Sequence, residues 1–252
     1  MYSINIFVTL FACGALQAAD FKDVTRTVPL HPNGAVTIEA YKGSIRVFTW
    51  DRPEAGIQAR IQPAGSSTLD RRRFDRTEVV IDSWSDSASV RTLYPPGSCC
   101  SWNTGQNPAV DYVIRMPRTA RLTIRDHRSD TEIRDLSGAL DLDTHSGTVR
   151  IYALSGPLEL RTHRGDVRVD VAAFPGNSLV ETHRGSVELL LPGDSRFNLQ
   201  TDLDRKASLE SDFPVLAHVS HRRGQSLEGA VNGGGPVLRL SAGRGQIRLR
   251  RK

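Results

Sequence analysis

The sequence predicts an all-β protein folded as a single-chain β-solenoid, in which two parallel sheets enclose one core and each coil takes about 18–20 residues. Three observations predict this fold: an internal repeat, apolar residues at every second position within each repeat, and glycines between the alternating segments. Such a repeat is typical of stacked architectures, in which one unit cannot bury its apolar face without its neighbours.

The repeat is clearest in three copies of one octapeptide. The spacing is 18 residues from His127 to His145 and again from His145 to His163, and the next copy follows after 20 residues. Weaker copies of the same strand–Gly–strand form lie at 35–50 and 235–250. The three octapeptides are THSGTVRI (144–151), THRGDVRV (162–169) and THRGSVEL (182–189).

Each repeat holds two alternating segments, for example TVRIYAL and PLELRTH, which have the period of a strand with one buried face. Strands of successive repeats would pair in parallel about 4.8 Å apart. The threonine of each THxG motif has the inward parity and the histidine after it the outward parity. The predicted inward columns are Val149, Val167 and Val187 on one sheet and Leu142, Leu160 and Val180 on the other.

Three segments of the chain are expected to differ in structure. Residues 1–18 read as a signal peptide, residues 19–118 as a less regular, β-rich N-terminal segment that begins and caps the solenoid, and residues 119–252 as the repeats. A short helix is expected at 67–76. The C-terminal run RLRRK places charge on the last strand, which would protect an open sheet edge.

The N-terminal segment predicts export from the cell. An apolar run from Ile4 to Leu16 precedes small residues and the first charge at Asp20, so cleavage is expected after Ala18. A lipoprotein signal at Cys13 is the alternative, and no stretch of the sequence has the pattern of a transmembrane segment. An exported chain with so few cysteines indicates the bacterial periplasm or cell surface.

The segments GGGPVLRLSAGRGQIRL and VDYVIRMPRTARLTIR, together with the repeated THxGxVxV, resemble the bacterial putative-adhesin family, a domain of unknown function with a β-helical fold. The resemblance covers most of the mature chain and implies an envelope protein. It implies little about chemistry, because the adhesin label rests on analogy of shape. The chain departs from the family pattern at Ser186 and Gln246, where Asp is frequent, and in its histidine column.

The histidine column and the arginines beside it are the first candidate site. Zinc or copper could bridge neighbouring imidazoles, but zinc prefers four ligands and the column holds no cysteine, so a stacked structural ladder without metal or cofactor is favoured. The column would continue into His221, with Arg222 and Arg223 beside it. The candidate ligand-facing residues are His127, Arg128, His145, His163, Arg164, His183 and Arg184.

The net charge of +5 comes almost entirely from arginine, which suits carboxylates and phosphates. A basic surface could hold lipopolysaccharide, an acidic glycan or extracellular nucleic acid. A mixed, solvated face is the favoured alternative, because Asp130, Asp141, Glu159 and Asp166 interleave with the arginines in sequence. The second candidate is the pair Cys99–Cys100, where a disulfide would be strained and could be redox-active or only rigidify the loop. A bridge to a second chain is an alternative, and a loop-packing role without redox chemistry is favoured.

These features predict a non-enzymatic exported envelope protein, an adhesin-like solenoid that acts as a binding or scaffolding surface. The expected partner is an anionic envelope glycan or another envelope protein, with no specific nucleic acid. One alternative is a carbohydrate-active β-helix enzyme, which needs a walled groove with two carboxylates about 5–9 Å apart. The other is a metal- or redox-responsive envelope sensor, which needs the histidine column or the cysteine pair to act.

Overall fold

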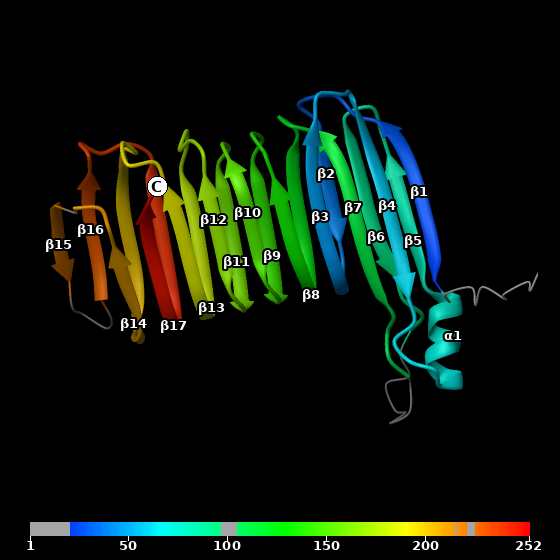
Figure 1. Ribbon diagram of the computed structural model, residues 1–252. Coiled ribbons are helices and arrows are strands. Elements are labelled where there is room, and N and C mark those ends of the chain that lie inside the picture. Colours follow the sequence, from blue (N-terminus) through cyan, green and yellow to red (C-terminus); the bar gives the residue numbers. More distant parts are fainter. Residues whose placement is uncertain (1–20, 97–104, 215, 221–224) are drawn as a thin grey trace, which may run out of the picture.

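The computed structural model describes residues 21–96, 105–214, 216–220 and 225–252. Within these ranges the chain forms one helix, α1 (Thr68–Arg76), and a 17-stranded sheet that folds back on itself as a solenoid (Figure 1). No helix among the described residues has the length and apolar character needed to cross a bilayer. The all-β, solenoid-like architecture predicted from the repeat is confirmed.

The strands are β1 (Lys22–Pro29), β2 (Ala35–Glu39), β3 (Lys42–Trp50), β4 (Glu54–Gln62), β5 (Glu78–Ser83), β6 (Ser87–Leu93), β7 (Ala109–Pro117), β8 (Arg121–Arg134), β9 (Leu140–Ser146), β10 (Val149–Leu154), β11 (Leu158–Arg164), β12 (Val167–Val171), β13 (Ser178–Leu191), β14 (Phe197–Ser211), β15 (Leu216–Ser220), β16 (Gln225–Val231) and β17 (Val237–Arg251).

A coil of the solenoid consists of two strand segments that meet at a corner. In β8, β13, β14 and β17 both segments belong to one long strand, which passes from one sheet to the other at that corner. The register follows the repeat, since Val149 pairs in parallel with Thr131 on one side and with Val167 on the other. Val167 in turn pairs with Val187, across the 20-residue coil.

The core lies between the two sheets and is made of the alternating apolar residues. Val149, Val167, Val187, Leu142, Leu160 and Val180 are all buried, as the parity predicts. The threonines at the corner, Thr144, Thr162 and Thr182, are buried as well. One residue beyond each threonine the side chain turns outward, which brings the histidines to the surface.

The order of the coils in space differs from their order in the chain. The β2–β3 coil lies between β6–β7 and β8, and β17 lies between β13 and β14 (Figure 1). The N-terminal segment therefore supplies regular coils of the solenoid as well as a cap. The expectation that the C-terminal strand forms a charged edge is wrong, because β17 is hydrogen-bonded to a parallel neighbour on each side.

The two ends of the array are antiparallel, which corrects the expectation of purely parallel sheets. At one end β1 pairs with β4, β4 with β7, and β5 with β6. At the other end β14 pairs with β16 and β16 with β15. Hairpins need only short connections, whereas a further parallel coil needs a crossover. Helix α1 is capped at its N-terminus by Ser67, whose side chain accepts a hydrogen bond from the Asp70 amide.

Candidate functional site

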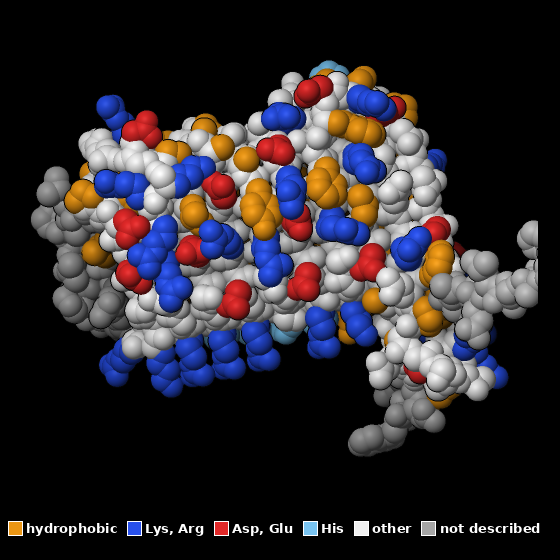
Figure 2. Space-filling model, viewed as in Figure 1, with side chains coloured by type: hydrophobic (Ala, Val, Ile, Leu, Met, Phe, Trp, Pro, Cys, Tyr) orange, Lys and Arg blue, Asp and Glu red, His pale blue; other side chains and the backbone are white. Residues whose placement is uncertain are grey.

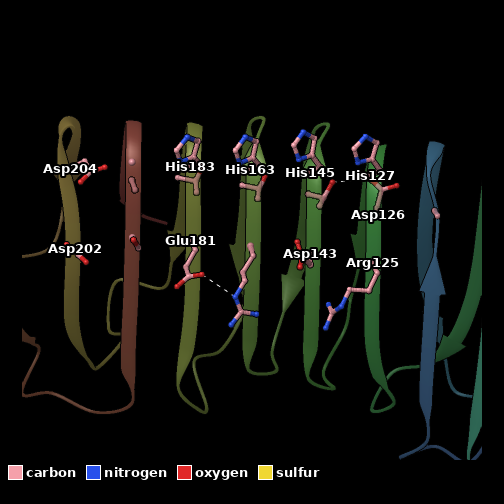
Figure 3. Close-up of a pocket in the computed structure, with 18 residues that line it drawn as sticks. Arg125, Asp126, His127, Asp143, His145, His163, Glu181, His183, Asp202 and Asp204 are labelled. Atoms are coloured by element: carbon pink, nitrogen blue, oxygen red, sulfur yellow. Dashed lines mark hydrogen bonds and ion pairs between the residues drawn. The ribbon is translucent and has the colours of Figure 1, made fainter. Parts of the chain in front are cut away.

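A ladder of stacked rings follows one corner of the solenoid. The imidazoles of His127, His145, His163 and His183 are nearly parallel, with successive ring centroids 4.6–4.8 Å apart (Figure 3). Tyr41 continues the stack, with its ring centroid 4.9 Å from that of His127. The spacing of the rings matches the spacing of strands in a sheet, so one ring stands on each coil.

The local sequence explains why the ring takes this place. In the motif Thr162-His163-Arg164-Gly165 the threonine points into the core, the histidine points outward, and the glycine turns the corner with φ +145°. That backbone conformation is unfavourable for residues with a side chain. The threonine fixes the inward parity and the glycine fixes the bend, so the histidine and the arginine are left on the outer face of the corner.

A line of cations runs beside the ladder, and we call these residues the basic row. Figure 2 shows a line of Lys and Arg side chains along the lower edge of the molecule. Strand register makes the line continuous, because Ser146 pairs with Arg128 on one side and with Arg164 on the other. The basic row, in spatial order, consists of Lys42, Arg128, Arg164, Arg184, Arg244 and Lys206, with Ser146 between Arg128 and Arg164.

The side chains of the basic row make no hydrogen bond or ion pair with another described side chain, and this distinguishes them from three arginines of the adjacent sheet faces. Arg125 is bound to Asp141 by two hydrogen bonds of 2.6 and 2.8 Å, and Arg161 reaches Glu181 at 3.2 Å. Arg168 pairs with Glu188. These three arginines are therefore compensated by neighbouring carboxylates, whereas the corner carries a continuous line of cations without such partners.

The acidic residues expected to interleave with these arginines have partners outside the basic row. Asp141 is paired with Arg125, and Glu159 with Arg161. Asp130 accepts a hydrogen bond from the Thr148 amide, and Asp166 accepts one from the Ser186 amide. Asp130 and Asp166 are exposed two positions beyond Arg128 and Arg164, so the mixed, solvated face stays a prediction for the surroundings of the corner.

A shallow groove of about 800 Å³ lies on the other side of the ladder and crosses β8, β9, β11, β13, β17 and β14. Carboxylates lie along it, and Figure 3 labels Asp143, Glu181, Asp202 and Asp204 on separate positions of its floor. A smaller hollow of about 450 Å³ opens at Gly243, the position on β17 that would otherwise continue the ladder. It is lined by His183, Asp204 and four cations, Arg184, Arg205, Lys206 and Arg244.

The electrostatics around His163 favour its neutral imidazole. The pKa of His163 is lowered from its ordinary value by desolvation, and then by the neighbouring histidines and arginines. A protonated ring would face other cations without a described carboxylate partner. The pKa of Asp126 is raised by burial, although Ser129 and Thr144 donate hydrogen bonds to its carboxylate. Asp126 therefore connects Ser129 and Thr144 by hydrogen bonds beneath the ladder.

The ladder is poorly shaped for a metal ion. Its rings are stacked within 6–11° of parallel, so their nitrogens point in a common direction rather than toward one point. In the described part of the chain no group of three or more His, Cys, Asp or Glu residues is arranged to hold a metal ion.

The structure brings together all seven predicted ligand-facing residues at one corner, and adds residues that the sequence reasoning missed. Tyr41, Lys42 and Gly43 form the same aromatic–cation–glycine triplet as His-Arg-Gly, and Arg244-Gly245 repeats its last two positions. These repeated triplets in the sequence could have located the additional residues of the ladder and the basic row. Cys99, Cys100, His221, Arg222 and Arg223 lie outside the described residues.

Comparisons with known proteins bear on the family and the fold of the chain. The family model described as Toastrack DUF4097 matches residues 118–248. A solved structure of a "putative cell adhesion protein" from Clostridium sporogenes is similar, with 10% sequence identity and a TM-score of 0.50 over 92% of this chain and 100% of that one. A "putative adhesin" from Parabacteroides merdae is 9% identical, with a TM-score of 0.22 over 90% and 96% of the two chains. None of the curated proteins matches the sequence.

Proposed function

Because the chain belongs to the Toastrack DUF4097 family, we propose that it is a non-enzymatic protein of the bacterial cell envelope that acts as a binding or scaffolding surface. Family membership supports the fold and leaves the ligand open. The similar Clostridium protein is described as a "putative cell adhesion protein", and a binding role of that kind suits an elongated solenoid. The partner we propose is an anionic envelope glycan or another envelope protein.

The observation that carries the proposal is the basic row. Six cations follow one corner without a carboxylate partner among the described residues, one on nearly every coil, while Arg125, Arg161 and Arg168 on the sheet faces are ion-paired. Lined-up like charges repel one another and destabilise the folded chain. A surface that keeps them unpaired is suited to an external partner of opposite charge.

The N-terminal segment supports the envelope location. Its apolar run, small residues and first charge at Asp20 follow the pattern of an export signal. We propose that residues 1–18 are removed on export and that the mature chain works in the periplasm or at the cell surface.

A carbohydrate-active enzyme is the second candidate, because carboxylates line the groove. Two arguments favour binding instead. The groove is shallow and its floor consists of strand faces, whereas substrate sites bury most of their ligand in a deeper pocket. Glu181 is also held by Arg161 at 3.2 Å, so this carboxylate is already engaged within the protein.

One experiment tests both the cellular location of the chain and whether it binds or cleaves envelope polysaccharide. The native chain is followed by fractionation and N-terminal mass spectrometry, then incubated with isolated envelope polysaccharide. We expect a mature chain that starts near Ala19 in the envelope fraction and that co-sediments with the polymer without shortening it. A Val8→Arg variant, which interrupts the apolar run, should stay inside the cell. An intact Met1 in the cytosolic fraction, or time-dependent shortening of the polymer, would overturn the proposal.

A further inference from the structure

We infer that the basic row seats a linear anionic polysaccharide, which lies along the solenoid axis and crosses the strands at a right angle. This inference rests on the proposed binding function and specifies its ligand. It follows from three features of the corner: the regular spacing of the cations, the covered ring faces of the inner ladder histidines, and the hollow at Gly243.

The spacing of the row fits a polymer with regularly repeated acidic groups. Each cation stands on its own strand, so neighbouring positions lie about 4.8 Å apart, and the row from Lys42 to Lys206 spans about 29 Å. Four of the six cations are arginines, whose planar guanidinium can bind a carboxylate, sulfate or phosphate through two hydrogen bonds. The side chains are exposed, so each contact alone is weak. Useful affinity therefore requires several contacts from one connected ligand.

The ladder argues for a polysaccharide rather than a nucleic acid. Proteins that hold single-stranded nucleic acid combine a basic groove with aromatic faces on which successive bases stack. Here the faces of His127, His145 and His163 are covered by their neighbours at 4.6–4.9 Å. A chain of sugars needs no such platform.

The hollow at Gly243 supplies an anchor for the polymer. Because Gly243 has no side chain, the ladder ends at His183 and leaves a space lined by Arg184, Arg244 and Lys206. Asp204 lies in the same space and can accept hydrogen bonds from sugar hydroxyls. This end of the row therefore offers both charge and a hydrogen-bond acceptor, and we assign it the highest share of the affinity.

Ser146 is the single uncharged position within the row, and this makes a gain of binding testable. It lies between Arg128 and Arg164 in register. A Ser146→Arg variant would complete the line without a clash in the core, since the position is on the outer face of the corner. The matched control is Thr27→Arg, which adds the same charge on exposed β1 at the capped end.

The test measures binding of oligogalacturonides, which carry one carboxylate per sugar, to the full mature chain by fluorescence polarisation. Affinity should rise with length until the oligomer spans the row, then level off. Replacing Arg164, Arg184 and Arg244 with Gln should weaken binding by about tenfold or more. The charge-matched control replaces Arg125, Arg161 and Arg168 with Gln and should change binding less than about twofold, because these side chains are ion-paired. Ser146→Arg should tighten binding and Thr27→Arg should not.

Three results would overturn the inference: equal loss in both triple variants, no length dependence, or tighter binding of a single-stranded oligonucleotide of equal charge. Circular dichroism checks that each variant is folded. Ser146→Arg adds a test in which the expected result is a gain of affinity, which misfolding of the variant would not produce. Co-sedimentation with envelope material distinguishes the two proposals. If the chain still binds envelopes but not oligogalacturonides, the ligand assignment fails and the binding function stands. If it binds neither, both fail.

Discussion

The close approach of coils at the glycine corner predicts a large cost for one added methyl group. In Gly165→Ala the new Cβ would lie well under 3.0 Å from the carbonyl oxygen of Gly147 on the next coil, a separation that real Cβ atoms essentially never show. The backbone also has φ +145°, a conformation unfavourable for alanine, for which a left-handed backbone costs about 1–2 kcal/mol. The oxygen belongs to a backbone hydrogen-bonded into the sheets, so the coils must separate to relieve the clash.

We expect Gly165→Ala to lower the free energy of unfolding by about 3 kcal/mol or more, of which strain accounts for less than half. For a chain of this size that corresponds to a fall in Tm of about 6–12 °C. The assay is thermal and urea unfolding followed by circular dichroism. Gly233→Ala is the matched control, because Gly233 also has a positive φ, +90°, but no atom within 4 Å of the added methyl group. It should lose only the strain. Equal losses in the two variants would refute the reasoning that contact between coils fixes the glycine.

The remaining predictions concern the core and the ladder. Thr162→Val should leave stability unchanged or raise it, because the Thr162 hydroxyl is buried without a hydrogen-bond partner among the described residues. Thr144→Val should lower stability by about 1–3 kcal/mol, because that hydroxyl donates to a half-buried carboxylate, and denaturant unfolding that ranks the two the other way would contradict this. Val167→Asp should lose at least about 1.5–3 kcal/mol of apolar burial, whereas Arg168→Glu on the exposed face should lose about 1 kcal/mol or less; equal damage would refute the alternating parity. The lowered pKa of His163 means that the unfolded chain binds more protons as the pH falls below about 6.5, so Tm should decrease from pH 7.5 to pH 5. The fall in Tm should be smaller in a His163→Gln variant. An equal fall in the two proteins would show that the titration of His163 does not cause it.

The sequence predicted the columns of the solenoid because they depend on local rules. Parity placed Val167 inside and His163 outside, and the recurring glycine marked the corner. The stacked rings follow from the same rules, since like residues at like positions on parallel coils must meet. The histidines and arginines of the candidate site were found for this reason.

The order of the coils could not be predicted, because any alternating strand offers the same backbone edge to a neighbour. Physical differences between the strands explain the observed order. β17 alternates regularly, with Leu238, Leu240, Ile247 and Leu249 buried, and it suits the interior of the array. The second half of β14 is mostly exposed and polar, and it suits the end. The insertion of β17 is what brings Arg244 beside Arg184 and completes the basic row.

The salt dependence of binding tests the central claim most directly, since it counts the cations that meet the ligand. The measurement is the affinity of the mature chain for a heparin decasaccharide across a range of salt concentrations. If the basic row makes the contacts, log Kd should rise steeply with log salt, and the Arg164, Arg184 and Arg244 to Gln variant should lose about two to three units of that slope. The Arg125, Arg161 and Arg168 to Gln variant should keep the slope of the unaltered chain. Equal slopes in all three proteins would contradict the account, because the corner would then take no part in binding.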